Sequence, residues 1–447
     1  MSPSNHERLS LGPAAAYADV DDRRPKAPKP EASKGENFAQ VREALALLLD
    51  EDVERAKAIL EPLLAAHPDD PDVLLVGGIL RFYEQRYDDA VLMLEEVAGE
   101  EDPGGYLALA KGTRDVVKKF ARFESDHFVV VHPKGKDEVL VPYALEALEA
   151  QRAALAKDLG WSPPGKVTVE FLNGVSELAT LSTLSEEEIR TSGTIAVCKF
   201  NKLMVVSPKA LLKGYDWLDT LAHEYAHHVI TRRTRNQTPI WLHEGLAKWS
   251  ETRWRGPGGA SFSPVSAALL KDALKKDELI TFEQMHPSMA KLPSQHAAAL
   301  AFAEVVMAVE YLVKQGGTPL VNRVLDLVAA GRPADKAVAE ALGVPFDRFV
   351  AGWKKHMAAR PMPKGGDHEL RKLRFRDDPK SAGPWSEWAE IPDPRAREFA
   401  RLGEIMRERG RFAAARLEYG KAIERVGTRF PILADQYALS AMMSGAE

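Results

Sequence analysis

The stretch that most constrains the fold is Leu221–Ile230, which contains the pentapeptide His-Glu-Tyr-Ala-His. His223 and His227 are four residues apart, so on a helix their imidazoles lie on the same side, one turn apart. Two neutral imidazole nitrogens at this spacing can bind one Zn²⁺, and Glu224 between them can reach a nucleophilic water on the metal. The pattern therefore predicts a metal-binding helix with Glu224 as general base.

The segment around this pentapeptide has the spacing of an amphipathic helix. Apolar residues recur at every third or fourth position, at Leu218, Leu221, Ala222, Tyr225, Ala226 and Val229. Asp216 is predicted to cap the N-terminus, with Asp219 three residues later in a carboxylate variant of the capping box. His223, Glu224 and His227 then lie on the flank of the apolar stripe, so we expect them to be half buried.

Zinc needs a third protein ligand, and the segment Trp241–Trp249 offers two candidates. Its apolar residues Leu242, Leu246 and Trp249 recur at helical spacing and predict a second helix. Glu244 is the preferred ligand and His243 competes with it. Gly245, beside the glutamate, would let this helix approach the first one closely.

Together, the HExxH pentapeptide and the later WLxEGLAxWxE segment resemble the gluzincin metallopeptidases, and most closely the peptidase MA-like domains related to aminopeptidase N. The resemblance covers roughly the middle half of the chain. It implies an α+β fold with a thermolysin-like zincin domain, made of a small mixed sheet, the HExxH helix and a helical lobe. It also implies that Glu244, and not His243, completes the zinc site. The pentapeptide alone also occurs by chance, and the second segment makes the metal site the better interpretation.

Two departures from the family pattern bear on the activity. Sixteen residues separate His227 from Glu244, slightly fewer than is usual in aminopeptidase N relatives. No GxMxN segment, with which those aminopeptidases hold a free amine, precedes the HExxH pentapeptide. An exopeptidase is therefore disfavoured.

Extended patterns precede the metal-binding helix. Strands are expected at His127–His132 and Val167–Leu172, with a helix ending near Leu159 between them, and a hairpin of Gly193–Cys198 and Lys202–Ser207 is expected across Phe200-Asn201. The resemblance implies that one of these strands is a sheet edge that takes an extended peptide by strand addition.

After the site, Arg253–Gly259 is predicted to be a loop, and the chain from Pro293 to Arg360 is predicted to be helical. The expected helices are Ala297–Val313, Pro319–Ala330, Ala334–Leu342 and Phe346–Met357. Relatives often supply a tyrosine or histidine from such a lobe to the developing oxyanion. Phe302 stands where a tyrosine would be expected, which leaves His296 and Tyr311 as candidates, although a structural role is the simpler interpretation of each.

The flanking regions carry a second pattern. Ala56 and Ala90 are 34 residues apart, as are Leu60 and Leu94, and this spacing resembles the tetratricopeptide repeat. A generic helical bundle is the alternative. The expected organisation is a disordered tail over 1–36, tetratricopeptide-like helices over 37–120, a zinc peptidase domain over 121–360, a polar linker over 361–394 and a tetratricopeptide-like hairpin over 395–447.

Composition narrows the class of protein and its partners. A net charge of −5 over 447 residues gives no case for nucleic acid as a partner. The single cysteine, Cys198, excludes an internal disulfide and is predicted to be a small buried residue. No membrane-spanning run and no signal pattern are visible, so a cytoplasmic protein without a membrane partner is expected.

The sequence supports two main functions. The first is a zinc metallopeptidase, an endopeptidase, that cleaves peptide or protein substrates and binds protein partners through its helical repeats. The alternative is a tetratricopeptide-repeat interaction scaffold whose zinc site is structural or vestigial, and a zinc aminopeptidase is a weaker third possibility. Asp219 and Glu251 are candidates to orient the histidines, although a solvated acid is the simpler interpretation of each.

Overall fold

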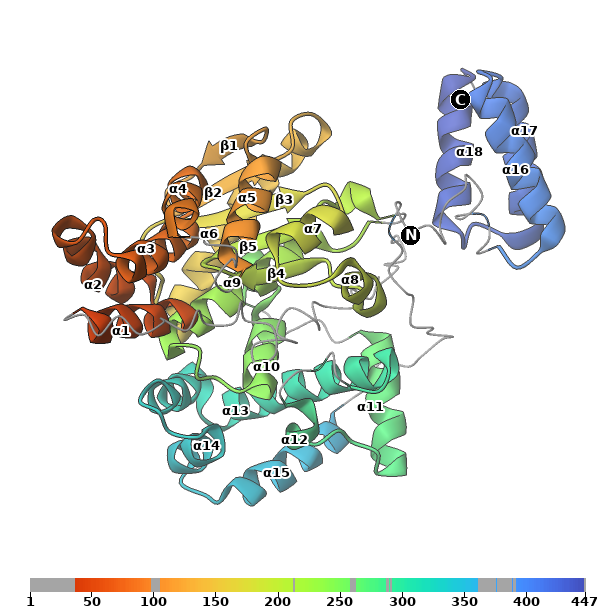
Figure 1. Cartoon of the computed structure of the whole chain (residues 1–447). Coiled ribbons are helices and arrows are strands. Elements are labelled where there is room, and N and C mark those ends of the chain that lie inside the picture. The colour runs from red at the N-terminus through yellow and green to blue at the C-terminus, as the bar shows by residue number, and fades with distance from the viewer. Residues whose placement is uncertain are drawn as a thin grey trace. The chain divides into compact units, whose positions relative to one another are not determined.

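The computed structural model describes residues 37–97, 105–211, 214–257, 263–286, 289, 292–360, 375, 388 and 391–445 (Figure 1). The chain divides into two compact units, Met1–Leu373 and Arg374–Glu447. The tail expected over 1–36 and most of the linker expected over 361–394 lie outside the described residues.

Five helices begin the first unit. They are α1 (Phe38–Leu49), α2 (Val53–Ala66), α3 (Pro71–Tyr83), α4 (Tyr87–Val97) and α5 (Tyr106–Val117), and each packs against the next. Asp70 caps α3 by accepting hydrogen bonds from the backbone N–H groups of Asp72 and Val73. Gly78 of α3 lies so close to Leu94 of α4 that an added Cβ would be 2.7 Å from the Leu94 Cγ. The small residue thus permits close contact between α3 and α4.

A small mixed sheet follows. Its strands are β1 (Ala121–Glu124), β2 (Phe128–His132), β3 (Val167–Leu172), β4 (Ala196–Lys199) and β5 (Lys202–Val206). The strand order is β1-β2-β3-β5-β4, with β2, β3 and β5 parallel and the two edge strands antiparallel to their neighbours. The expected hairpin is present, because Lys199 pairs with Lys202 and the turn between them is Phe200-Asn201. The mostly helical unit around this sheet is compatible with the expected α+β class.

Helices cover the sheet and build the centre of the unit (Figure 1). α6 (Val141–Leu159) connects β2 to β3, and the short helices α7 (Val175–Leu181) and α8 (Glu186–Ser192) lie between β3 and β4. α9 (Trp217–Thr234) packs against β4, β5 and α6, and α10 (Ile240–Ser250) packs against α9. The helix that carries the HExxH pentapeptide is therefore enclosed by other elements.

A helical lobe completes the first unit. It contains α11 (Pro264–Lys276), α12 (Phe282–Met285), α13 (Gln295–Ala329), α14 (Ala334–Leu342) and α15 (Phe346–Ala359). α13 is interrupted at Gly316 and Gly317, so its two halves correspond to the two helices expected there. Among the described residues, His296–Ala329 is the helix long and apolar enough to cross a membrane, but most of it is buried inside the protein.

Glu304 on α13 gives this lobe a pH-dependent stability. Its carboxyl accepts a hydrogen bond from the Ile280 N–H at 2.9 Å, and burial raises its pKa to about 8. The folded state binds the proton of the Glu304 carboxyl more tightly than the unfolded chain does. The contribution of Glu304 to the free energy of unfolding is therefore complete below about pH 4.5 and is lost as the pH rises toward 8. Glu304→Gln removes this dependence. We expect its stability relative to wild type to increase by about 2–4 kcal/mol between pH 5 and pH 9, measured from urea unfolding. An identical difference at both pH values would contradict this assignment.

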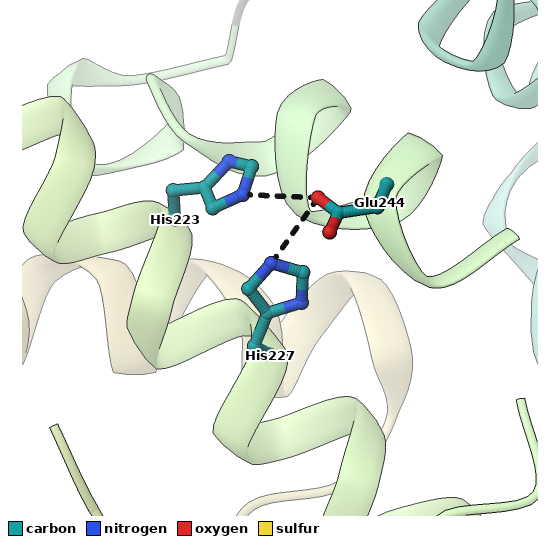
Figure 2. A group of neighbouring side chains, drawn as sticks. All are labelled: His223, His227 and Glu244. Atoms are coloured by element: carbon teal, nitrogen blue, oxygen red, sulfur yellow. Dashed lines mark ion pairs between the residues drawn. The ribbon is translucent and has the colours of Figure 1, made fainter. Parts of the chain in front are cut away.

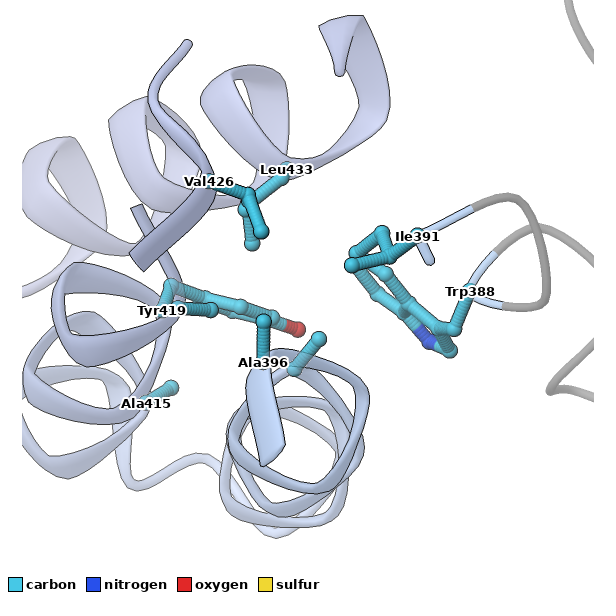
Figure 3. Packing of buried hydrophobic residues seen from close by; sticks show 9 residues of the cluster. Trp388, Ile391, Ala396, Ala415, Tyr419, Val426 and Leu433 are labelled. Carbon is cyan, nitrogen blue, oxygen red and sulfur yellow. The ribbon is translucent and has the colours of Figure 1, made fainter. Parts of the chain in front are cut away.

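The second unit is a helical hairpin with a third helix. α16 (Pro394–Glu408), α17 (Phe412–Val426) and α18 (Pro431–Met443) enclose an apolar core around Tyr419 (Figure 3). Tyr419 packs on Gly403, where an added Cβ would be 2.7 Å from the Tyr419 Cε1. Trp388 and Ile391, which fall within the expected linker, also pack into this core. The core of this unit therefore includes residues that precede α16.

Candidate metal centre

Helix α9 begins differently from the sequence prediction. Asp216 occupies the N-cap position, but its side chain makes no capping hydrogen bond to the helix. Asp219 accepts a hydrogen bond from the Trp254 Nε1 at 2.9 Å and pairs with Arg255 at 2.7 Å. The capping box predicted for Asp216 and Asp219 is therefore wrong, since Asp219 is held by residues that follow α10.

Burial of α9 is also greater than expected. His223, Glu224 and His227 are each 0% exposed, whereas their position beside an apolar stripe predicted half-buried side chains. The reason is that α9 is surrounded by β4, β5, α6, α10 and α13. Three ionisable groups thus lie in an environment where an uncompensated charge is costly.

Helix α10 brings Glu244 to the histidines, but Gly245 has a different neighbour from the one predicted. A Cβ added to Gly245 would lie 2.7 Å from the backbone oxygen of Val305 and 2.9 Å from the Val309 Cγ2, both on α13. The glycine therefore permits close packing of α10 on the helical lobe, and the prediction that it serves the approach to α9 is wrong. Glu244 precedes Gly245 by about 100° around α10, so its side chain faces α9 while the glycine faces α13.

The structure brings His223, His227 and Glu244 together (Figure 2). The Glu244 Oε2 is 3.5 Å from the His223 Nε2 and 3.4 Å from the His227 Nε2. One donor atom of each residue lies within 4.8 Å of the other two. The three side chains thus direct their donors to a common point.

The other nitrogen of each imidazole faces a different partner. The His223 Nδ1 is 3.4 Å from the Glu251 Oε2, and Glu251 pairs with Lys248 at 2.7 Å. The His227 Nδ1 is 2.6 Å from the His243 Nδ1, and the two rings are stacked. The partners at both Nδ1 atoms fix the orientation of the two rings, so that each Nε2 faces Glu244.

His243 was considered from the sequence only as a competing ligand. In the structure it lies behind His227, and its Nε2 is 3.1 Å from the Thr231 Oγ1. Its position next to Glu244 in the sequence gave no sign of this contact, because the residue one place before the glutamate points to another side of α10. Sequence reasoning therefore missed a residue that holds His227.

The pKa values of the group follow from burial and ion pairing. Burial lowers the pKa of His223, but Glu244 and Glu251 outweigh this effect and raise it to about 9. Burial raises the pKa of Glu244, but His227 and His223 outweigh it and lower it to about 2. Glu244 is thus a carboxylate at neutral pH, the charge state required of a metal ligand.

Glu224 is set apart from these ion pairs. Burial raises the pKa of Glu224 to about 8; the charge of His223 acts against this rise, and the negative charge of Glu244 adds to it. The backbone N–H of Cys198 on β4 faces the carboxyl and acts against the rise. Neither carboxyl oxygen has a partner within hydrogen-bond geometry among the described residues. A buried acid with a pKa near neutrality and free oxygens is suited to general base chemistry.

The donor set can be tested against zinc by its chemistry and spacing. Two imidazole nitrogens and one carboxylate are a common catalytic zinc set. Two donors bound at about 2.0–2.2 Å in a tetrahedral site are about 3.4 Å apart, which agrees with the two distances from the Glu244 Oε2. The His223 Nε2 and both Glu244 oxygens are buried without a hydrogen bond from the described part of the chain. The residues therefore fit the metal.

The two candidates for an oxyanion donor, Tyr311 and His296, have other surroundings. The Tyr311 ring packs against Phe349 and His356 in the helical lobe, and His296 is exposed on α13. Phe302 is buried. None of these contacts brings either candidate to His223, His227 or Glu244.

Comparison with known proteins gives a family match over the region that carries this site. Residues 148–359 match the family model of the Peptidase MA superfamily, and this range contains α9, α10 and the helical lobe. The uncharacterized protein YhcO of Bacillus subtilis (strain 168) is 24% identical over 155 residues, which are 31% of this chain and 45% of that relative. The chain thus spans less than half the length of this curated relative. Over residues 148–359 the chain is similar to the Peptidase MA superfamily, which supports a peptidase-like domain of that clan.

Proposed function

We propose that the protein is a zinc-dependent metallopeptidase that cleaves peptide bonds within a chain. The observation that carries this proposal is the convergence of His223, His227 and Glu244 beside the buried Glu224 carboxyl. The match of the central region to the Peptidase MA superfamily supports it. His223, His227 and Glu244 would hold the metal as three protein ligands and leave a fourth position open.

Glu224 performs the proton transfers in this proposal. When bound, zinc would lower the pKa of a water from about 15.7 to about 7 and polarise the scissile carbonyl. Glu224 accepts a proton from the attacking water and then delivers it to the leaving amine. Burial raises the pKa of Glu224 and a bound Zn²⁺ would act against this rise, so the carboxyl is placed to take and give a proton near neutral pH.

Two further side chains support the ligands. Glu251, held by Lys248, faces the Nδ1 of His223, and His243, held near Thr231, faces the Nδ1 of His227. Such contacts fix the imidazole orientation and hold each Nε2 toward the position that the metal would take. Each histidine therefore has its own positioning group on α10 or directly after it.

The sheet edge supplies a site for the substrate backbone. β4 pairs with β5 on one side, and within the described sheet its other side has no strand partner. α9 packs against β4, and the Cys198 N–H of this strand faces Glu224. An extended peptide added to β4 would run past Glu224, and main-chain hydrogen bonds would bind it with little dependence on its sequence.

Metal removal tests this proposal. Wild-type protein loaded with one equivalent of zinc is expected to cleave members of a broad peptide library, and dialysis against a chelator should abolish cleavage. Re-addition of zinc should restore it. Equal cleavage of peptides with free and acetylated N-termini is expected of an endopeptidase, whereas a requirement for the free amine would indicate an aminopeptidase.

A structural zinc site in an interaction scaffold is the second candidate. The observation that favours it is the complete burial of His223 and His227, which is typical of closed structural sites. Protein that binds one zinc but cleaves no library member, and that unfolds when the metal is removed, would support this alternative. The helical repeats would then bind protein partners without any chemistry on them.

A further inference from the structure

The turn between β4 and β5 is held by a carboxylate from the N-terminal helices. Phe200 and Asn201 have φ angles of 58° and 59°, the left-handed conformation of a tight two-residue hairpin turn. Their backbone N–H groups donate to Glu51, at 2.8 Å to Oε1 and 3.1 Å to Oε2. Glu51 lies between α1 and α2 and is 8% exposed. One buried carboxylate thus binds both amides of the turn.

The aromatic residues of α3 and α5 surround the same turn. The Phe200 ring lies 5.2 Å from the Phe82 ring, 5.6 Å from Tyr83 and 6.5 Å from Tyr106, all in edge-on contacts. Such contacts add to the gain from burying the rings. The turn of the central sheet therefore covers this face of the N-terminal helices.

The metal-binding helix contacts the turn from the other side. Arg232 of α9, five residues after His227, donates to the Asn201 Oδ1 at 2.7 Å and also pairs with Glu54 of α2. Asn201 in turn donates to the Tyr83 carbonyl at 3.4 Å. The N-terminal helices, the hairpin turn and α9 thus share one set of polar contacts.

The turn determines where β4 lies. β4 has only four residues, Ala196–Lys199, and its ladder to β5 ends at the pair Lys199 and Lys202 that flanks the turn. Cys198, whose N–H faces Glu224, is two residues before Phe200. A strand this short has few ladder bonds of its own, so its position depends on its fixed end.

We propose that Glu51 is a positioning residue, which fixes the β4–β5 turn so that β4 is presented to substrate at a set distance from Glu224. The role of β4 as the substrate edge rests on the proposed function. The N-terminal helices then act as part of the peptidase scaffold, in addition to any partner they bind.

The carboxylate form of Glu51 is what this role requires. Two adjacent backbone N–H groups need two acceptor oxygens, and Glu51 supplies both. Glutamine has the same size but only one acceptor oxygen. Its NH₂ group, which is a donor, would lie opposite one of the two backbone N–H donors. Glu51→Gln therefore disturbs the turn without changing the volume of the buried side chain.

The test compares Glu51→Gln with Glu61→Gln in the full-length protein. Glu61 also lies on the N-terminal helices, but it pairs with Arg81 at 2.7 Å, so its replacement is a matched control for charge. The first readout is amide hydrogen exchange of residues 194–207, which needs no activity. The second is the kinetics of a fluorogenic peptide chosen from the library by wild-type cleavage.

We expect Glu51→Gln to exchange these amides about tenfold faster and to raise KM about tenfold, with kcat within about twofold of wild type. Zinc content should stay at the wild-type value. Asn201→Gly keeps the left-handed turn but loses the contacts to Arg232 and Tyr83, and it should raise KM in the same direction. Glu61→Gln should match wild type in both readouts.

Unchanged exchange in Glu51→Gln would overturn the proposal, and so would a wild-type KM or a loss confined to kcat. Wild-type protein that cleaves no peptide would contradict the proposed function instead. The exchange data would then still decide whether Glu51 holds the turn.

Discussion

Replacing Glu224 by glutamine is expected to reduce peptide hydrolysis by about 10²–10⁴-fold, the usual contribution of a general base. Glutamine has nearly the same shape, so the packing around residue 224 should be preserved. It cannot accept the proton of the attacking water at neutral pH. Glu224 is not one of the three converging donors, so the variant should keep one zinc per chain.

The measurement is kcat for a library peptide, with zinc content determined on the same sample. Glu278→Gln is a suitable control because Glu278 is exposed and its replacement makes the same change of charge. Turnover of Glu224→Gln within about a factor of two of wild type would contradict the assignment of Glu224 as the base. Loss of zinc from this variant would indicate that Glu224 serves the metal directly.

Glu244→Ala is expected to remove zinc binding at micromolar metal. Its carboxylate lies within 3.5 Å of both imidazole nitrogens and carries the negative charge of the donor set. Because loss of an outer contact to a ligand already costs about 10–100-fold in affinity, loss of a ligand itself should cost more. The measurement is zinc affinity by competition with a chromophoric chelator.

The variant His243→Ala tests whether Glu244 or His243 is the third zinc ligand. His243 faces the Nδ1 of His227, away from Glu244, so its removal should weaken zinc binding by no more than about 10–100-fold. If Glu244→Ala bound zinc as tightly as wild type while His243→Ala did not, the third ligand would have been assigned to the wrong residue.

The sequence alone predicted the local secondary structure around this site well. The four-residue spacing of His223 and His227 required only helical geometry, and the spacing within Trp241–Trp249 indicated a second helix. The hairpin across Phe200-Asn201 also follows from two short apolar runs with a two-residue gap. The residues preferred Glu244 but left His243 in competition as the third ligand, and the family resemblance settled the choice.

Long-range contacts account for what the sequence did not predict. Gly245 packs against Val305 and Val309, which lie far away in the chain, and no local pattern could reveal that partner. Glu51 binds a turn 149 residues later, and a single acid in a helical region carries no signal of such a contact. Full burial of His223, Glu224 and His227 likewise depends on elements that precede and follow α9 in the chain.

The most direct test of the central claim is X-ray absorption at the zinc edge of the purified wild-type protein loaded with one equivalent of metal. Two imidazole nitrogens and carboxylate or water oxygens are predicted, all at about 2.0–2.2 Å. A sulfur at about 2.3 Å, or a spectrum with fewer than two imidazoles, would contradict binding by His223, His227 and Glu244.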